Sequence, residues 1–234
     1  MCRLQARPVV GYEAGGALAG DFLSSGTAMI DWAINGGVAL ITLAGPPSNG
    51  FTLESLSHLQ RLLEALSGDA LVKAVVITGQ GDEFFSVGTK VPGLAQIAQA
   101  PDGAARERFE RVQEALKAAR PLTVAAINGD ACGDGAFCAL ACDHRIAEEQ
   151  AVLALSGVAG PMAHPLQIGA FGALRSGLIE RVVPKGMALE AALEMARRVR
   201  GLSAEEIRLF KNALRVAQRD RATRNDPHAS MQRA

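Results

Sequence analysis

The chain has 234 residues and a balanced charge, with 24 lysines and arginines against 24 aspartates and glutamates. A net charge of +0 excludes a general attraction for nucleic acid or for an anionic membrane surface. Hydrophobic residues make up 49% of the chain and charged residues 21%, as in ordinary globular proteins, and no apolar run approaches the roughly 18 residues of a membrane span. We therefore expect one cytoplasmic domain with a substantial core and neither a membrane nor a nucleic-acid partner.

The two ends of the chain differ in composition from its centre. Residues 1–29 are rich in glycine, and Glu13 and Asp21 interrupt their apolar run, so they lack the pattern of a signal peptide. We expect a flexible N-terminal extension over 1–29. Residues 219–234 are polar, which predicts a C-terminal tail that frays.

The first elements are predicted from turn residues and apolar spacing. Two apolar runs in 30–43 flank the sequence Asn-Gly-Gly, which predicts a β-hairpin because asparagine and glycine tolerate positive φ angles. Leucines recur at helical spacing between Thr52 and Leu66, and Glu54 lies in the first turn, where the helix dipole favours it. The β-branched run 71–78 predicts a buried strand.

Strands and helices continue to alternate in the second half of the chain. A helical stripe runs from Ala105 to Ala119 and ends before Pro121. The remaining expected elements are a strand at 122–127, a glycine-bearing loop at 128–136, a helix at 137–142, strands at 144–147, 152–155 and 178–183, and helices at 189–199 and from Ser203 to Val216. Ser203 and Glu206 have the spacing of a capping box. This alternation predicts an α/β fold with right-handed crossovers.

The four cysteines do not form a recognisable ligand set. They are Cys2, Cys132, Cys138 and Cys142, and no two of them are spaced as a CxxC pair. We interpret the last three as small buried apolar residues and expect no metal; a metal or redox site is the alternative.

Several segments together resemble one known family. They are VALITLAGPPSNGFTLESLSHLQRLLEAL, VKAVVITGQGDEFFSVGTK, RPLTVAAINGDACGDGAFCALACDHRIAEEQA and SGLIERVVP, and they occur in the family's order. The chain resembles the crotonase (enoyl-CoA hydratase/isomerase) superfamily from about residue 30 to 215. The resemblance implies a crotonase-like spiral of ββα units over 30–176. It also implies a helical C-terminal region over 177–234 that makes a homotrimer or a dimer of trimers.

The resemblance also implies a chemistry, the stabilisation of a thioester enolate by two backbone N–H groups that form an oxyanion hole. Position by position, the donors are the amides of Thr89 and Asp134. The substrate implied is an acyl-CoA or acyl-carrier-protein thioester, with no tightly bound cofactor. The alternative interpretation of the two loops is that they are merely tight turns, with glycine required by the backbone.

At three positions the chain departs from the family. Asp134 replaces a glycine, and its carboxylate would repel a forming oxyanion unless it points away or is protonated. Phe137 and Gly157 stand where hydratases carry two glutamates, and neither can activate water or deliver a proton. We therefore expect decarboxylation or double-bond isomerisation, as a lyase or an isomerase, in place of ordinary hydration. The alternative is a catalytically inactive homologue that serves as a binding or scaffold subunit.

Other polar residues are candidates by position. Lys90 could bind a substrate carboxylate and His164 could shuttle protons; their alternatives are a solvated lysine and a structural histidine. Displaced acids, Glu83 or Glu148, are a third possibility, although neither aligns with a catalytic position. By the resemblance, CoA would contact Ser48, Asn49, Gly50 and Val87. Lys211 would approach its phosphates, often from a neighbouring subunit, or else lie on a solvated helix face. The segment 164–177 is shorter than in the family.

Overall fold

The structure is a computed structural model, and it describes residues 29–46, 48–89, 103–155 and 166–224. The expected N-terminal extension, apart from Met29, lies outside these residues, and so does the tail from residue 225. Lys90, Gly157 and His164 also lie outside them.

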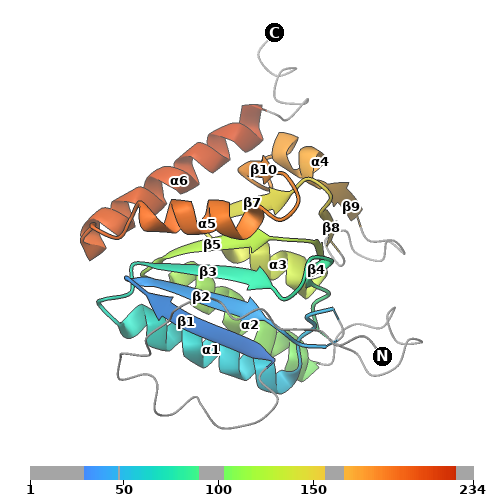
Figure 1. Cartoon of the computed structure of the whole chain (residues 1–234), viewed down its shortest axis with the longest axis horizontal. Coiled ribbons are helices and arrows are strands. Elements are labelled where there is room, and N and C mark those ends of the chain that lie inside the picture. The colour runs from blue at the N-terminus through green and yellow to red at the C-terminus, as the bar shows by residue number, and fades with distance from the viewer. Residues whose placement is uncertain (1–28, 47, 90–102, 156–165, 225–234) are drawn as a thin grey trace.

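A six-stranded sheet forms the centre of the described chain, in the order β1-β2-β3-β5-β7-β10 (Figure 1). Its strands are β1 (Ile30–Asn35), β2 (Val38–Leu43), β3 (Ala74–Gly79), β5 (Leu122–Ile127), β7 (His144–Glu148) and β10 (Arg181–Val183). Strand β1 pairs antiparallel with β2, and every other neighbouring pair is parallel. The predicted hairpin is confirmed: Asn35 pairs with Val38, and the two glycines between them have φ angles of 53° and 79°.

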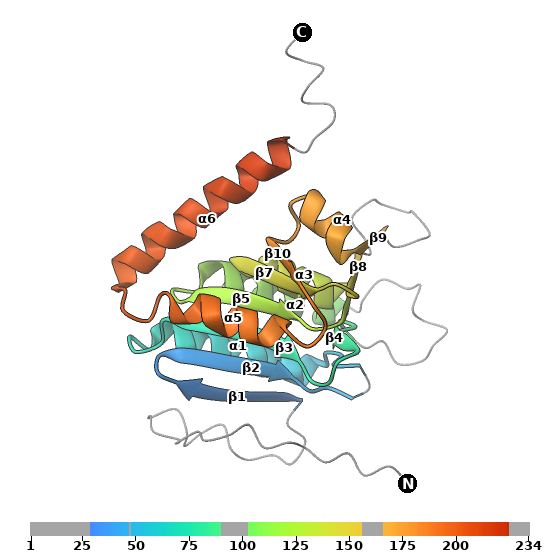
Figure 2. The same ribbon diagram turned by 45° about the horizontal axis from the view of Figure 1, so that its top comes forward.

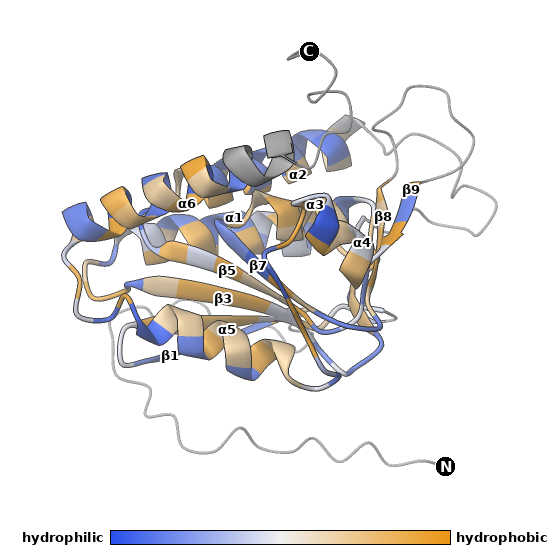
Figure 3. Cartoon of the chain, turned by 90° about the horizontal axis from the view of Figure 1, so that it is seen from above, coloured by the Kyte–Doolittle hydropathy of each residue, from blue (hydrophilic) through white to orange (hydrophobic). Residues whose placement is uncertain are grey.

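Helices cover both faces of this sheet. Helices α1 (Leu53–Gly68), α2 (Gly103–Ala118) and α3 (Asp134–Ala141) pack on one face, and α5 (Ala188–Arg197) packs on the other. Figure 3 shows the apolar strands β3 and β5 between these layers. Buried strand residues alternate between the two cores: Val75 and Ile77 face the α1 side, whereas Ala74 and Val76 face α5. A parallel strand that is buried on both faces needs apolar residues throughout, as the sequence of β3 has.

A second sheet, of four strands, has the order β4-β6-β8-β9. It contains β4 (Phe84–Ser86), β6 (Asp130–Cys132), β8 (Val152–Leu155) and β9 (Leu166–Gly169), and helix α4 (Ala170–Arg175) follows it. Strand β4 follows β3, β6 follows β5 and β8 follows β7, so each of these pairs places one strand in each sheet. Helix α2 follows the first pair and α3 the second. The expected ββα spiral and α/β class are therefore confirmed.

The last helix, α6 (Ala204–Arg224), runs across the molecule from its corner with α5 (Figure 2). It is longer than the expected helix, which ended at Val216. The predicted capping box is present, because the Ser203 N–H donates to Glu206 Oε2 at 2.7 Å and the Glu206 N–H donates to Ser203 Oγ at 3.3 Å. Among the described residues, every helix is too short or too polar to cross a lipid bilayer.

A buried carboxylate, Asp143, anchors α6 to the sheet. Its Oδ2 lies 2.8 Å from Lys211 Nζ and also accepts from the Thr123 N–H and hydroxyl, while its Oδ1 lies 3.3 Å from Arg215 Nη2. The backbone carbonyl of Asp143 accepts from Gln218 Nε2 at 2.7 Å. These three side chains of α6 recur at helical spacing, so one face of the helix docks on one residue.

Replacing Lys211 with alanine is expected to destabilise the fold. The buried Asp143 carboxylate would lose its cation, which costs about 3 kcal/mol, at the low end for a broken buried pair because Thr123 and Arg215 remain. Thermal or urea unfolding measures this cost. The matched control is Arg208→Ala on the same helix, which breaks an exposed ion pair with Glu205 and should change stability little. Equal stability of the two variants would contradict the anchoring role of Asp143.

Candidate functional site

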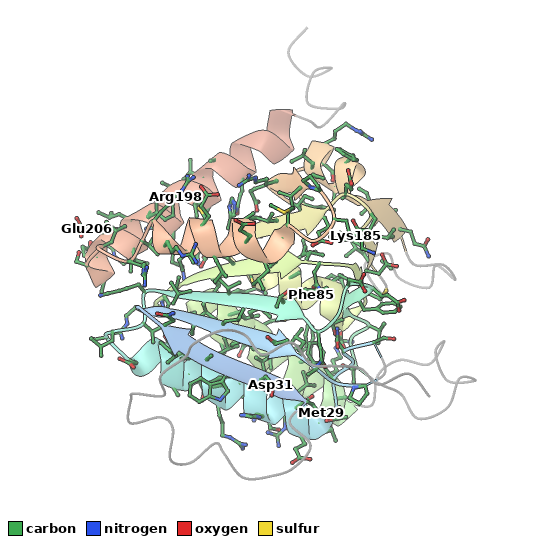
Figure 4. The ribbon with its side chains drawn as sticks, in the orientation of Figure 1. Met29, Asp31, Phe85, Lys185, Arg198 and Glu206 are labelled. Carbon is green, nitrogen blue, oxygen red and sulfur yellow. The ribbon has the colours of Figure 1, made fainter. Side chains whose placement is uncertain are left out.

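The two loops that carry the expected oxyanion donors leave neighbouring strands. Residues 87–89 follow β4, and Gly133 and Asp134 follow β6. Strands β4 and β6 pair in parallel, so their carboxyl ends lie at the same edge of the small sheet. Figure 4 shows Phe85 of β4 away from Glu206, which lies at the start of α6. The loops are therefore brought together on the side of the molecule away from the α5–α6 corner.

The loops touch through their backbones at Gly88. A Cβ atom placed on Gly88 would lie 2.8 Å from the Asp134 nitrogen and 2.9 Å from the Cys132 carbonyl oxygen. Gly88 also has a φ of 79°, a conformation that side chains disfavour. A side chain at this position would push the loops apart, so the contact requires glycine at position 88.

The amides of Thr89 and Asp134 are both open. The Phe51 N–H donates to the Gly88 carbonyl at 2.7 Å, and in a trans peptide the next N–H points the opposite way, so the Thr89 N–H points away from Phe51. Asp134 is the first residue of α3, and the first N–H groups of a helix have no partner within the helix. No described residue accepts a hydrogen bond from either amide. The two loops thus place two neighbouring backbone donors that have no acceptor among the described residues.

The side chains of the same two residues are joined. The Thr89 hydroxyl donates a hydrogen bond to Asp134 Oδ2, across the junction of the two loops. Asp134 is half-buried and lies in the first turn of α3, where the helix dipole favours a negative charge. The sequence did not predict this link, because Thr89 and Asp134 are 45 positions apart and no local pattern connects them.

The segment expected to contact CoA lies beside this loop. Ser48 and Asn49 have φ angles of 62° and 56°, and their carbonyls accept from the Val87 N–H at 3.1 Å and the Ser86 hydroxyl at 2.7 Å. Ser48, Asn49, Gly50 and Val87 are therefore brought together next to Thr89.

Asn49 has a supporting role that sequence reasoning missed. Its side-chain Nδ2 donates to the carbonyls of Gln80 at 2.9 Å and Phe84 at 2.8 Å, and the residue is 6% exposed. The amide of Asn49 thus connects its turn to the chain entering β4. An asparagine before glycine in a breaker-rich segment was the available signal, but it indicates a turn and not the partners of the side chain.

Lys211 does not lie near the two loops. Its Nζ donates to the carbonyls of Ala119 and Pro121, immediately before β5 begins, and pairs with Asp143. The loop of Asp134 follows the other end of β5, and a six-residue strand is roughly 17 Å long. With Lys211 only 5% exposed, its ammonium is held inside its own chain, so the alternative of a solvated helix face is wrong, and Lys211 would have to leave Asp143 to approach a phosphate.

The remaining candidates fall into three groups. Lys90, His164 and Gly157 lie outside the described residues. Phe137 is half-buried against the core on α3 and offers no polar group. Of the displaced acids, Glu83 is exposed, whereas Glu148 is buried, where its carboxylate accepts from Gln150 Nε2 at 2.8 Å and the Ala188 N–H at 3.3 Å.

The cysteines of the described chain are protonated thiols at neutral pH. Burial, and secondarily the charge of Asp134, raises the pKa of Cys138 to about 12, and burial also raises the pKa of Cys142. Cys132, half-buried beside the Asp134 loop, has a pKa raised by burial and by Asp130. No group of three or more potential metal ligands occurs within the described residues. The interpretation as buried apolar residues is confirmed for Cys138 and Cys142, whereas Cys132 is only half-buried.

Gly88→Ala should damage the junction of the loops. The matched control is Gly81→Ala, because Gly81 has a similar φ of 82° but open space around it. We expect the control to lose roughly 1–2 kcal/mol from its backbone conformation alone. Gly88→Ala should lose about 1–3 kcal/mol more, because its Cβ overlaps backbone atoms that cannot move independently. Chemical unfolding of both variants measures the difference, and equal losses would show that the loops do not meet as described.

Comparison with known proteins shows the family to which the chain is similar. The sequence model of the family described as "Enoyl-CoA hydratase/isomerase" matches residues 33–160, more than half of the chain. A protein of Bacillus subtilis (strain 168), named "Putative enoyl-CoA hydratase/isomerase YngF", is 33% identical over 178 residues. That alignment covers 75% of this chain and 65% of the relative, so the chain spans slightly less than two thirds of its length.

Solved structures agree with the sequence match. Pseudomonas aeruginosa DspI superposes with a TM-score of 0.72 at 36% identity, covering 91% of this chain and 90% of DspI. A monofunctional enoyl-CoA isomerase from M. smegmatis superposes with a TM-score of 0.66 at 30% identity, covering 82% and 94% of the two chains. With its ββα spiral and its paired donor loops, the chain belongs to the enoyl-CoA hydratase/isomerase family of the crotonase superfamily.

Proposed function

We propose that this protein stabilises the enolate of an acyl thioester, carried by CoA or by a carrier protein, at the amides of Thr89 and Asp134. The observation that carries the proposal is the pair of open N–H groups at the Gly88 junction. Donors fixed in the backbone act where negative charge develops and need no reorganisation during the reaction. They also survive the replacement of side chains, which matters here because the residues around them have changed.

The chemistry that accompanies this hole differs from hydration. Adding water to an enoyl thioester requires groups that activate water and deliver a proton, and Phe137 and Gly157 replace both family glutamates. Double-bond isomerisation and decarboxylation both pass through an enolate and do not consume water. The similarity to a monofunctional enoyl-CoA isomerase supports the same group of reactions.

A non-catalytic role is the second candidate. The loss of both glutamates and the presence of Asp134 beside the donors favour it. Two unit negative charges about 5 Å apart repel by about 3 kcal/mol at an effective dielectric constant of about 20, which is a large penalty for an enolate. In this case the protein would keep the fold as a binding or scaffold subunit.

Calorimetry with acetyl-CoA and crotonyl-CoA, together with an assay for crotonyl-CoA hydration, separates these candidates. We expect binding of both thioesters and no hydration. Gly88→Ala should weaken binding at least tenfold, because it displaces the two donors, whereas Gly81→Ala should bind as the unaltered chain does. Failure to bind either ligand would reject a CoA-dependent enzyme, and hydration at an ordinary rate would reject the altered chemistry.

We also propose that the chain forms a homotrimer, or a dimer of such trimers, through its C-terminal region. Leu209 and Val216 on α6 are 55% and 59% exposed and lie on one face of the helix. Unpartnered apolar residues at helical spacing suit a contact between subunits.

Light scattering should give a mass three or six times that of the chain. The double variant Leu209→Glu and Val216→Glu should lower that mass, whereas Leu71→Glu, at a residue that is 78% exposed outside α6, should not. A monomeric unaltered chain would contradict the assembly.

A further inference from the structure

We propose that the Asp134 carboxylate is the base that moves the α-proton of the bound thioester, and that Thr89 positions it. This inference rests on the thioester site proposed above and assigns its acid–base group. It selects proton transfer, as in double-bond isomerisation, over decarboxylation.

The first argument is the lack of competing bases beside the donors. Among the described residues, Glu83 is exposed on another turn and Glu148 is buried with its own donors. Asp130 accepts from the Val152 N–H at 2.9 Å, and Cys132 is a protonated thiol. Asp134 carries its carboxylate on the same residue that supplies one of the donor amides.

The second argument is the way in which Asp134 is held. One of its oxygens, Oδ2, accepts from the Thr89 hydroxyl, while Oδ1 accepts nothing from the described residues. A hydrogen bond to one oxygen restricts the side-chain rotamer and leaves the other oxygen open to a proton. Asp134 is half-buried, so its proton can exchange with solvent. Thr89 therefore has two roles at one junction, an amide for the oxyanion and a hydroxyl for the base.

The third argument is charge balance. A carboxylate beside the hole opposes any second negative charge, but a base loses its charge as it takes the proton. When the C2–H bond of a 3-enoyl thioester breaks, its electron pair forms the dienolate, and the oxyanion lies at the two amides. The proton is then on Asp134 and returns to C4, which moves the double bond to C2–C3. One negative charge is present throughout, and no other reactant is needed.

Decarboxylation does not keep a single negative charge in the site. Its substrate brings a carboxylate, and carbon dioxide leaves the negative charge behind as an enolate, so two negative charges face each other at every stage. A nonpolar side chain near Asp134 is also consistent with an uncharged substrate. Phe137 lies three residues after Asp134 on α3, where it packs against the core and carries no charge. The substrate class inferred is thus an unsaturated acyl thioester whose acyl chain carries no charge.

Hydrogen–deuterium exchange at C2 of butanoyl-CoA in D2O, followed by mass spectrometry, tests the base without knowledge of the natural substrate. The unaltered protein should incorporate deuterium. Asp134→Asn keeps the shape and the acceptor for Thr89 but cannot take a proton, so exchange should fall by about 100-fold or more. Calorimetric affinity for butanoyl-CoA should not weaken. Exchange by Asp134→Asn within threefold of the unaltered protein would overturn the assignment.

Variants of Thr89 test whether its hydroxyl positions Asp134. They also provide a second test of the inference if Asp134→Asn does not fold. Thr89→Val removes the hydroxyl and keeps the amide, so exchange should fall by about tenfold with unchanged affinity, whereas Thr89→Ser should restore it. Equal exchange by these two variants would reject positioning by Thr89. Binding of butanoyl-CoA without exchange would overturn the Asp134 base and leave the thioester site standing, whereas absence of binding would overturn both. Release of carbon dioxide from malonyl-CoA faster than exchange would also overturn the inference.

Discussion

The parallel pairing of β4 with β6 is the contact on which the functional part of this structure depends. It brings together two loops that lie about 45 residues apart, and glycines allow their backbones to meet. Gly88 faces the start of α3, and a Cβ on Gly135 would lie 2.2 Å from the Ser86 carbonyl oxygen. Backbone contacts this close fix the positions of the donor amides without relying on any side chain. The proposed oxyanion hole, which is built from these amides, therefore does not depend on the side chains around it.

The proposed function therefore combines backbone donors in a fixed position with side chains that differ from those of a hydratase. By the resemblance, Phe137 and Gly157 stand at the positions of two family glutamates, and Asp134 stands in a loop that is proposed to donate to the oxyanion. A carboxylate that stayed charged would repel the enolate. As proposed above, Asp134 takes up a proton as the enolate forms, so its negative charge disappears when that of the enolate appears. The Thr89–Asp134 hydrogen bond holds the carboxylate at the same junction of loops that positions the two amides.

The C-terminal region shows a different kind of constraint. Helix α6 is attached through a buried cluster around Asp143, in which the two hydrogen bonds from Thr123 and the cation of Lys211 satisfy one carboxylate. Burying these charges is tolerable only because each has a partner. The cluster occupies the end of β5 opposite the donor loops, so the attachment of α6 and the candidate chemistry are spatially separate.

The sequence by itself determined the features that arise from neighbouring residues. The Asn-Gly-Gly turn, the leucine stripe of α1, the apolar run of β5 and the capping box at Ser203 are each set by interactions within a few positions. Long motifs in the family's order identified the family and the spiral, and they gave the two amides on which the proposed function rests. Only the tertiary structure decided that Lys211 pairs with Asp143, that Asn49 supports β4, and that Thr89 binds Asp134. The physical reason is that each of these partners lies tens of residues away, where only the packing of the strands decides which polar groups meet.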